Sequence, residues 1–430
     1  MKKKETVWIV SQYAGAPGIG MQYRQFQFAK ELKKLGHEVV IISGSFSHLY
    51  RHLPTTNSTF THDEIEGVPY LWVKNPKYAK SISIGRFWNM LIFAWRLLFL
   101  PTHELPQPTL VVVSSPSMLP IKAALKWKKK FNTQVFFEVR DIWPLTLQEL
   151  GGLSNTHPLV SFMRHYEKMA YTHADKVISL LPNAQAHYEA GGMAPEKFVY
   201  IPNGIEIGEG GNGLERDGEG GNGLEKVGEG ERRLDKRLAR RDTLLKDIDQ
   251  EKVIVGYGGS LGTANALDYL LDAAELLVNE TKLHFVLVGK GDDVNHLKSR
   301  AKDLPNVSIY PPVEKKEFLA LLDQFDICYL GLRPDSLFRF GVSPNKLFDY
   351  MQAAKPIIFN IDSGNKPVDE AQCGISVIPG DTGALCDAIL ALLRMSEEER
   401  NKLGQNGKNF ALANHTYPIL VERLLASMYE

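Results

Sequence analysis

Short apolar runs alternate with helix-like segments along the N-terminal half of the chain. Residues 7–10 form one such run, residues 23–35 carry apolar side chains at helical spacing, and residues 38–42 form the next run. Strand, helix and strand repeated in this way predict a parallel sheet that is covered by helices on both faces. Further strands are predicted at residues 110–113, 134–139 and 176–180, with a helix at residues 121–130.

The same alternation begins again at residues 253–255. The fold class expected is therefore α/β, with two doubly wound, Rossmann-like parallel-sheet domains that face a cleft. Ligands of such sheets bind at the carboxyl ends of the strands, which is where candidate chemistry is sought. The remaining strands are predicted at residues 284–288, 307–310, 327–329 and 356–359, and the helices at residues 267–278, 345–353, 382–395 and 401–429, the last with a break near Pro418.

A charged, glycine-rich tandem repeat separates the two halves. Residues 208–217 read GEGGNGLERD, and residues 218–227 read GEGGNGLEKV. This composition cannot bury enough apolar surface to offset chain entropy, so a mobile linker is predicted, and residues 232–249 after it are helix-compatible. The predicted organisation is an N-terminal domain over 1–204, a linker over 205–250, a C-terminal domain over 251–400 and a helical segment over 401–430.

Charge and cysteine content narrow the functional classes. Lys and Arg total 50 and Asp and Glu total 50, and this balance gives no support to a nucleic-acid partner. Three widely spaced cysteines, Cys328, Cys373 and Cys386, fit neither a disulfide framework nor a paired metal site. We therefore expect a reducing compartment and no metal site. The apolar run near the N-terminus is also too short for a secretory signal.

The apolar stretch at residues 87–100 bears on membrane contact. A polar and a charged residue interrupt it, and it is shorter than the ~20 residues that span a bilayer, so no transmembrane helix is predicted. Arg86, Trp88 and Trp95 on this helix suit a membrane interface. A buried or half-buried core helix is the alternative.

A glycine-rich loop, residues 15–20, follows the first predicted strand. Gly18 and Gly20 lie in it, where glycine lets the backbone approach a ligand and the start of the next helix favours negative charge. The glycine order is GxxGxG rather than the dinucleotide fingerprint GxGxxG, and residues 43–45 after the second strand offer no acidic residue for a ribose. A nicotinamide-dependent enzyme is therefore disfavoured. A plain connecting turn is the alternative to a ligand-binding loop.

Charged residues close a further predicted strand, in the segment EVRDIWP at residues 138–144. Arg140 and Asp141 are expected at the carboxyl edge of the sheet, where a carboxylate can orient a substrate hydroxyl or share its proton. A purely structural pair of Arg140 with Asp141 is the alternative.

Glycines and a cation follow two predicted strands of the second half. Gly259 and Ser260 lie in the loop 258–262, whose backbone N–H groups can hold a diphosphate. Lys290 follows the next strand and stands between two glycines. An ordinary strand-to-helix turn is the alternative for this loop.

Residues 341–351, GVSPNKLFDYM, predict the start of another helix. Ser343 is the predicted N-cap and Pro344 the first helical residue. Lys346 falls in the first turn, where the helix dipole disfavours a cation, and this points to an anionic ligand. Asp349 follows three residues later on the same face, with a solvated helix face as its alternative role.

At these positions the chain resembles a known family. Residues 260–274, residues 346–354 and the stretch from 179–183 to 202–204 look like those of family 4 glycosyltransferases with the GT-B fold. The nearer resemblance is to the bacterial O-antigen and capsule transferases known as L-fucosamine transferase-like, and it covers nearly the whole chain outside 208–246. The stretches that carry this nearer resemblance are 45–49, 72–78, 140–144 and 341–350.

The resemblance implies a retaining transferase without an obligatory metal or cofactor, which holds the acceptor on its N-terminal domain and the nucleotide on its C-terminal domain. Asp349 matches the second acid of the family's E-x7-E motif, which binds the ribose, whereas the first acid falls at Gly341. The basic pair that holds the diphosphate falls at Ser260 and Asn265, neither of which is basic. The candidates for the missing charge are Lys290, Lys346 and Arg339.

The activity expected is transfer of a sugar, an N-acetylated or 6-deoxy hexosamine, from a UDP-sugar to a lipid-linked saccharide of an O-antigen or capsule. It is expected at the cytoplasmic face of the membrane, with peripheral contact through residues 86–100. An epimerase or phosphorylase of the same fold and an inactive sugar-binding protein are the alternatives. The expected catalytic residues are Asp141, Arg140 and Lys346; the expected donor-binding residues are Gly259, Ser260, Lys290, Ser343, Asn345 and Asp349; those of the acceptor-side loop are Gly18 and Gly20.

Overall fold

The computed structural model describes residues 4–21, 23–79, 83–149, 151–206, 245–313 and 315–430. The chain divides into two compact units, Met1–Glu206 with Tyr417–Glu430, and Ile207–Thr416. The tandem repeat at 208–227 lies outside the described residues, and so does most of the helix-compatible stretch at 232–249. The described end of that stretch forms bends and turns, in which Leu245 and Ile248 are buried.

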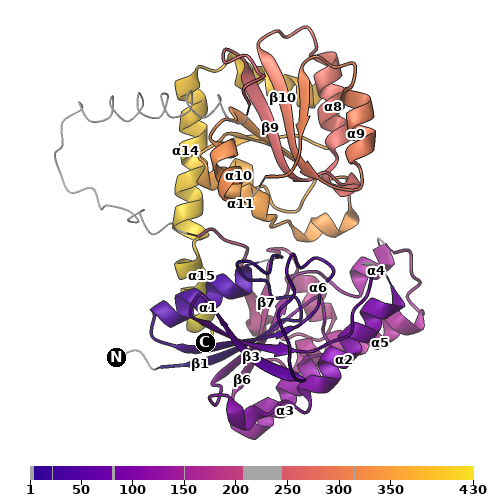
Figure 1. Ribbon diagram of the computed structural model, residues 1–430, viewed down its shortest axis with the longest axis vertical. Coiled ribbons are helices and arrows are strands. Elements are labelled where there is room, and N and C mark those ends of the chain that lie inside the picture. Colours follow the sequence, from indigo (N-terminus) through magenta and orange to yellow (C-terminus); the bar gives the residue numbers. More distant parts are fainter. Residues whose placement is uncertain (1–3, 22, 80–82, 150, 207–244, 314) are drawn as a thin grey trace, which may run out of the picture. The chain divides into compact units, whose positions relative to one another are not determined.

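The first unit is built on a sheet that, within the described residues, has eight strands in the order β3-β4-β2-β1-β5-β6-β7-β8 (Figure 1). β3 pairs antiparallel with β4, and the other neighbours in this sheet are parallel. β5 is buried along its whole length, as expected of a strand covered on both faces. The strands are β1 (Thr6–Val10), β2 (Glu38–Gly44), β3 (Phe60–Ile65), β4 (Val68–Val73), β5 (Leu110–Ser114), β6 (Gln134–Val139), β7 (Lys176–Ser179) and β8 (Phe198–Tyr200).

The hairpin of β3 and β4 is an element that the sequence pattern did not predict. β3 reads FTHDEI and lies at the edge of the sheet with its polar side chains exposed, so it lacks a continuous apolar run. Glu66 and Gly67 between the strands both have positive φ, 48° and 76°, which is the geometry of a tight hairpin turn. The hairpin extends the parallel sheet by one strand beyond β4.

Helices cover both faces of this sheet, and alternate residues of β1 show which helix lies on which face. Val7 and Ile9 pack in the core that α1 and α15 share, whereas Trp8 meets Trp127 of α3 with ring centroids 5.3 Å apart. Figure 1 shows α1 with α15 on one side of the strands and α2, α3 and α5 on the other. The helices are α1 (Arg24–Lys34), α2 (Ile84–Leu97), α3 (Ile121–Phe131), α4 (Leu145–Glu149), α5 (Pro158–His173), α6 (Gln185–Ala190) and α15 (Tyr417–Ala426).

The last thirty or so residues, which the sequence pattern set apart as one helical segment, are divided between the two units. α14 (Glu397–Asn414) packs on α11 of the second unit, whereas α15 packs on α1 of the first. Leu420 and Leu424 enter the core of the first unit, and the backbone N–H of Tyr417 donates to the carbonyl of Ile205 at 3.2 Å. The last helix of the chain is therefore part of the first unit because its apolar residues are buried in that unit's core.

The second unit contains, in its described part, a six-stranded parallel sheet with the order β11-β10-β9-β12-β13-β14. Both units are thus doubly wound parallel α/β domains, which confirms the predicted fold class. α8, α9 and α13 lie together over one face of this sheet, and α10, α11 and α14 lie on the other side (Figure 1). The elements are β9 (Val253–Ser260), β10 (Leu283–Lys290), β11 (Val307–Tyr310), β12 (Ile327–Gly331), β13 (Ile357–Asn360), β14 (Gly374–Ser376), α8 (Leu267–Leu276), α9 (Val294–Ala301), α10 (Lys315–Leu322), α11 (Asn345–Gln352), α12 (Pro367–Glu370) and α13 (Thr382–Arg394).

Candidate functional site

Two glycine loops meet at the carboxyl ends of β9 and β10. The register places Gly259 beside Gly289 and Ser260 beside Lys290. A Cβ atom on Gly289 would lie 1.8 Å from the carbonyl oxygen of Gly259, and the φ of Gly289 is +157°. Only glycine permits this approach of two backbones. The loops therefore need glycine for packing, and their N–H groups still lie at the strand ends where ligands of such sheets bind.

Lys346 of α11 extends over the first of these loops. Its ammonium donates to the hydroxyl of Tyr257 at 2.5 Å and to Oδ1 of Asn265 at 2.8 Å. The same nitrogen lies 4.4 Å from the centre of the Tyr257 ring, in cation–π geometry. A Cβ atom on Gly259 would lie 2.7 Å from Cε of Lys346, so the aliphatic stem rests on this glycine. Residues far apart in the sequence thus fix one cation above a glycine loop.

Burial weakens the hold of Lys346 on its proton. Desolvation lowers the pKa of the Lys346 ammonium to about 8, although Asp349 one turn along α11 opposes this shift. A cation that is expensive to desolvate, and that stands in a helix first turn without an acidic neighbour in that turn, is placed to meet an anion.

The start of α11 differs from the sequence prediction. The helix begins at Asn345, and Pro344 is the N-cap residue, in extended conformation with φ −72° and ψ 136°. Ser343 was predicted as the N-cap, and this prediction is wrong, because Ser343 lies one residue too early and the N-cap residue is Pro344, whose side chain cannot accept a hydrogen bond. The first N–H groups of α11 lie at the end of the helix that favours an anion.

The remaining predicted residues of the second unit are less closely gathered. Lys290 and Asn345 are exposed, Asp349 is half-buried, and Lys290 meets the glycine loop through its backbone, which pairs with Ser260. Arg339 lies with its guanidinium 4.3 Å from the ring centre of Phe340 and donates to the carbonyl of Ser336. Lys346 is the candidate cation whose described side-chain contacts include the glycine loop.

Gly341 occupies the position where the resemblance leads one to expect an acid. Its φ of 99° and ψ of 174° fall in a region that is essentially restricted to glycine. The loop is held there by Asn365, whose Oδ1 accepts from the N–H of Val342 at 2.8 Å and whose Nδ2 donates to the Val342 carbonyl at 3.1 Å. The backbone conformation itself thus disfavours a glutamate at this position.

Tyr257 and Asn265 are functional candidates that sequence reasoning missed. The sequence identified Asn265 only as a position without a charge, and it gave Tyr257 no role. Both lie more than eighty positions before Lys346 in the chain, so no local periodicity could join them to it. The signal that could have pointed to them is a polar residue on each side of the glycine loop 258–262.

In the first unit, Arg140 and Asp141 lie directly after β6. Both backbone N–H groups approach Oγ of Ser115, at 2.8 and 3.4 Å, which orients the loop. The Asp141 residue is exposed to solvent. Neighbouring protein atoms still desolvate its carboxyl and raise the pKa of that group, while the charges of Arg140 and Arg86 act to lower it. The Arg140 guanidinium donates to Oε1 of Gln25 at 3.4 Å. Arg140 is thereby tied to α1, and Asp141 is the member with an exposed carboxylate.

A buried ion pair lies next to the loop that carries Arg140 and Asp141. Arg24 Nε donates to Glu138 Oε1 at 2.8 Å, and both side chains are buried. Burial acts to raise the pKa of Glu138, but Arg24, Arg140 and a hydrogen bond from Ser114 hold it below its usual value. Gln25 also donates to Glu138, at 3.4 Å. The carboxylate of Glu138 is consequently a structural anchor for α1 and β6.

The acceptor-side glycine loop folds back on itself. The N–H groups of Ile19 and Gly20 both donate to the carbonyl of Ala16, and Arg51 donates its N–H to the carbonyl of Ile19 at 2.8 Å. Gly18 and Gly20 have φ of +79° and +93°. These contacts account for both glycines as turn residues, which is the alternative that the sequence left open, and the N–H of Gly20 is already used within the turn.

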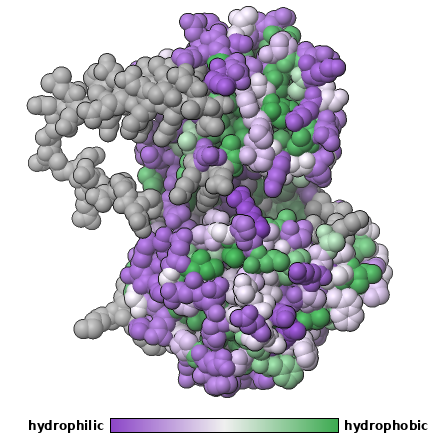
Figure 2. All heavy atoms as spheres, viewed as in Figure 1, coloured by the Kyte–Doolittle hydropathy of each residue, from purple (hydrophilic) through white to green (hydrophobic). Residues whose placement is uncertain are grey.

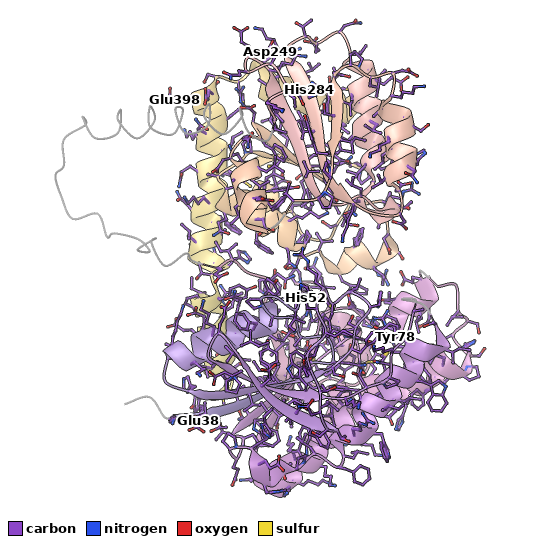
Figure 3. All side chains as sticks on the ribbon, in the orientation of Figure 1. Glu38, His52, Tyr78, Asp249, His284 and Glu398 are labelled. Carbon is purple, nitrogen blue, oxygen red and sulfur yellow. The ribbon has the colours of Figure 1, made fainter. Side chains whose placement is uncertain are left out.

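An aromatic cluster beside this loop also escaped sequence reasoning. Tyr13 accepts from Nε of Arg86 at 3.4 Å, and the Arg86 guanidinium lies 5.4 Å from the centre of the Tyr13 ring. Nδ1 of His48 lies 3.2 Å from the hydroxyl of Tyr78, which Figure 3 labels in the first unit. Tyr13, His48 and Tyr78 come from the loops after β1, β2 and β4, so they gather at the carboxyl edge of the sheet, as does Asp141. Arg86, which the sequence suggested for a membrane interface, reaches Tyr13 from the first turn of α2.

α2 has one buried face and one exposed apolar face. Met90, Phe93 and Leu97 are buried in the unit, as the alternative of a core helix required. The opposite side carries large apolar side chains, and Figure 2 shows hydrophobic residues at the surface of the first unit where α2 and α5 lie in Figure 1. The exposed fractions are 79% for Ile84, 57% for Trp88, 60% for Trp95 and 64% for Phe99.

Within the described ranges, no helix is long and apolar enough to cross a bilayer. The same residues contain no group of three or more His, Cys, Asp or Glu side chains placed to hold a metal ion.

Both units match families of known proteins. Residues 20–204 match the family described as glycosyl transferase 4-like domain, and residues 252–395 match the family described as glycosyl transferases group 1. The chain belongs to the group 1, family 4-like glycosyltransferases. Sugar transfer is thus the activity of the family, and the glycine loop under Lys346 lies in its group 1 domain. Among curated protein sequences, none matches the chain.

Solved structures that match nearly the whole length of the chain include several sugar transferases. A sucrose-phosphate synthase from Thermosynechococcus elongatus is 15% identical with a TM-score of 0.68, over 99% of this chain and 98% of that one. The Anabaena protein HepE, solved in complex with UDP, is 13% identical with a TM-score of 0.63, over 99% of both chains. The lipopolysaccharide outer core galactosyltransferase WaaB is 12% identical with a TM-score of 0.59, again over 99% of both. At these identities the likeness shows the fold, and that fold is GT-B.

Proposed function

We propose that this glycosyltransferase moves a sugar from UDP to a lipid-linked saccharide, with retention of the anomeric configuration. The observation that carries the donor half of the proposal is the Lys346 ammonium, fixed 2.8 Å from Asn265 and resting on Gly259 in the loop at the end of β9. A diphosphate leaving group gains negative charge as the sugar bond breaks, and a fixed cation stabilises that charge.

UDP is the nucleotide proposed because HepE was solved with UDP and with UDP-glucose. In this chain the N–H of Ser260 and the N-terminus of α11 are proposed as further donors to the phosphates. Asp349, one turn into α11, is proposed to accept from the ribose hydroxyls. Lys290, exposed beside Ser260, adds charge at the rim, while Ser343 and Asn345 flank the start of α11.

The first unit is proposed to bind the acceptor. Asp141 presents an exposed carboxylate at the carboxyl edge of the sheet and is proposed to orient the acceptor hydroxyl. Arg140 is proposed to hold the shape of this loop through Gln25. No metal ion or cofactor is required in this proposal, because Lys346 and the N–H groups meet the charge of the diphosphate. The nearer resemblance to O-antigen and capsule transferases favours a surface-polysaccharide intermediate as acceptor and a hexosamine as the sugar.

The affinity for UDP should fall as pH rises through about 8. Lys346 binds its proton below that pH and loses it above, so the attraction to the diphosphate is present at pH 7.5 and weakened at pH 9.5. Titration calorimetry with UDP at both pH values tests this, with Lys346→Ala titrated alongside because the uracil ring of UDP also loses a proton towards the upper pH. In Lys346→Ala the affinity should be lower, and it should fall less between the two pH values than in wild type. An equal fall in the two proteins would contradict the role of Lys346.

A second part of the proposal is contact of the first unit with the cytoplasmic face of a membrane. The exposed stripe of Ile84, Trp88, Trp95 and Phe99 follows helical spacing along α2 and its end, and tryptophan suits the bilayer interface. α3 lies beside α2, with Lys126 donating to the carbonyl of Leu98. Such a surface would bring the enzyme to an acceptor with a lipid anchor.

Replacing both Trp88 and Trp95 by Glu should lower the fraction of protein that sediments with lipid vesicles, because two interfacial anchors are exchanged for charges. The matched control exchanges two exposed apolar residues of the second unit, Leu276 and Ile378, for Glu. The control should sediment as the wild type does. Equal binding by the two double variants, with thermal unfolding unchanged in both, would exclude α2 as the contact.

A further inference from the structure

Four groups at the end of β9 form a closed ring of hydrogen bonds. The carbonyl of Ser260 accepts from the hydroxyl of Tyr257 at 2.7 Å and from Nδ2 of Asn265 at 3.0 Å. The oxygens of the same two side chains accept from the ammonium of Lys346. Tyr257 and Asn265 therefore stand between one backbone carbonyl and one cation, and each contacts both.

The ring has a fixed direction. Asn265 can donate to a carbonyl and accept from an ammonium at the same time in only one orientation of its amide. Tyr257 uses its proton towards Ser260, so only its lone pairs face Lys346. Burial raises the pKa of the Tyr257 hydroxyl, which keeps that proton in place. With each donor and acceptor assigned, the ammonium has one preferred position.

The glycine loop is held from its other side as well. The N–H of Leu261, on the same peptide unit as the Ser260 carbonyl, donates to the carbonyl of Lys290 at 2.9 Å. Side chains fix the oxygen of this peptide unit and β10 fixes its nitrogen. The loop and the ammonium are thus preorganised as one rigid group, which is the arrangement that makes a fixed charge effective in catalysis.

We infer that Tyr257 and Asn265 are positioning residues that set where the cation stands over the loop, and that a cation delivered from position 265 can replace Lys346. This inference rests on the proposed function, since the anion in question is the diphosphate of the donor. Its basis is geometric: the end of the Asn265 side chain lies 2.8 Å from the Lys346 nitrogen, so the two positions reach the same point from α11 and from the loop after β9. In the variant with a lysine at position 265, the hydroxyl of Tyr257 still donates to the Ser260 carbonyl.

The experiment is a relocation of the charge, read by UDP titration at pH 7.5. Lys346→Ala should weaken UDP binding about tenfold. Adding Asn265→Lys to that variant should bring the affinity back to within about threefold of wild type. The matched control adds Thr263→Lys instead, which places the same charge on an exposed position of the same loop. If Asn265→Lys recovers no more affinity than Thr263→Lys, the inference is wrong.

A second variant keeps the test decisive if the double variant unfolds. Tyr257→Phe keeps the ring and removes the hydroxyl, so the ammonium loses one acceptor and its pKa should drop further. The fall of UDP affinity with rising pH should then begin at a lower pH than in wild type. An unchanged pH midpoint would overturn the positioning role of Tyr257. Wild-type protein that binds no UDP at any pH would instead contradict the proposed function itself.

Discussion

Lys346→Ala is expected to slow sugar transfer about a hundredfold at saturating donor, with the fold intact. The charge on the diphosphate grows as the sugar bond breaks, so a fixed cation stabilises the transition state more than the bound donor. Loss of one preorganised electrostatic donor costs about a hundredfold to a thousandfold in turnover. Lys346 is the described cation with direct contacts to the glycine loop, through Tyr257, Asn265 and Gly259. Release of UDP per unit time is the measurement.

Two lysine variants calibrate that result. Lys290→Ala should cost less, because the side chain of Lys290 is exposed and its contact with the loop is made by the backbone, which the substitution keeps. Lys298→Ala, which removes an exposed lysine from α9, should leave turnover unchanged and serves as the matched control. If Lys346→Ala turns over like Lys298→Ala, the charge comes from another group, and Arg339 is the next residue to change.

Asp349→Ala is expected to weaken UDP binding at least tenfold. A carboxylate that accepts from both ribose hydroxyls makes charge-assisted hydrogen bonds worth about 1.5–3 kcal/mol each, and about 1.4 kcal/mol already corresponds to tenfold in affinity. Asp349 is half-buried on α11, one turn from Lys346. Calorimetric titration with UDP and with inorganic pyrophosphate separates its two possible effects.

The comparison of ligands is what makes this test specific. Loss of a ribose contact should weaken UDP binding and leave pyrophosphate binding at least as strong, because pyrophosphate has no ribose and Asp349 is itself negative. Asp303→Ala, which removes an exposed carboxylate after α9, is the matched control. UDP affinity that stays the same in Asp349→Ala would assign Asp349 to a solvated helix face.

Much of the fold followed from the sequence because parallel strands that are buried on both faces read as continuous apolar runs. β1, β2, β5 and β6 of the first unit lie where such runs predict them. β3 could not be found in this way, since an edge strand with exposed polar residues has no such run. The return of α15 to the first unit was also hidden, because it depends on contacts with α1 that are remote in the sequence.

The candidate site shows the same limit at the level of single residues. Lys346 could be singled out from sequence because a lysine in the first turn of a helix conflicts with the helix dipole. Its partners Tyr257 and Asn265 could not, since only the folded sheet brings the end of β9 under α11. The N-cap at Ser343 was predicted from residue preference, and the extended conformation of Pro344 overrode it by one position. The sequence showed only that glycine occupies position 341, where the resemblance implies an acid. The backbone angles of Gly341 explain why glycine is favoured at that position.

Transfer itself is the most direct test of the proposed function. The protein is incubated with lipid-linked saccharides and a panel of UDP-sugars, and mass spectrometry follows both the lipid fraction and the nucleotide. One UDP-sugar should add the mass of a single sugar residue to the lipid-linked acceptor and release UDP in equal amount, and Lys346→Ala should slow both about a hundredfold. Conversion of a UDP-sugar with no gain in acceptor mass, or no reaction with any donor by protein that binds UDP, would contradict transfer to a lipid-linked saccharide.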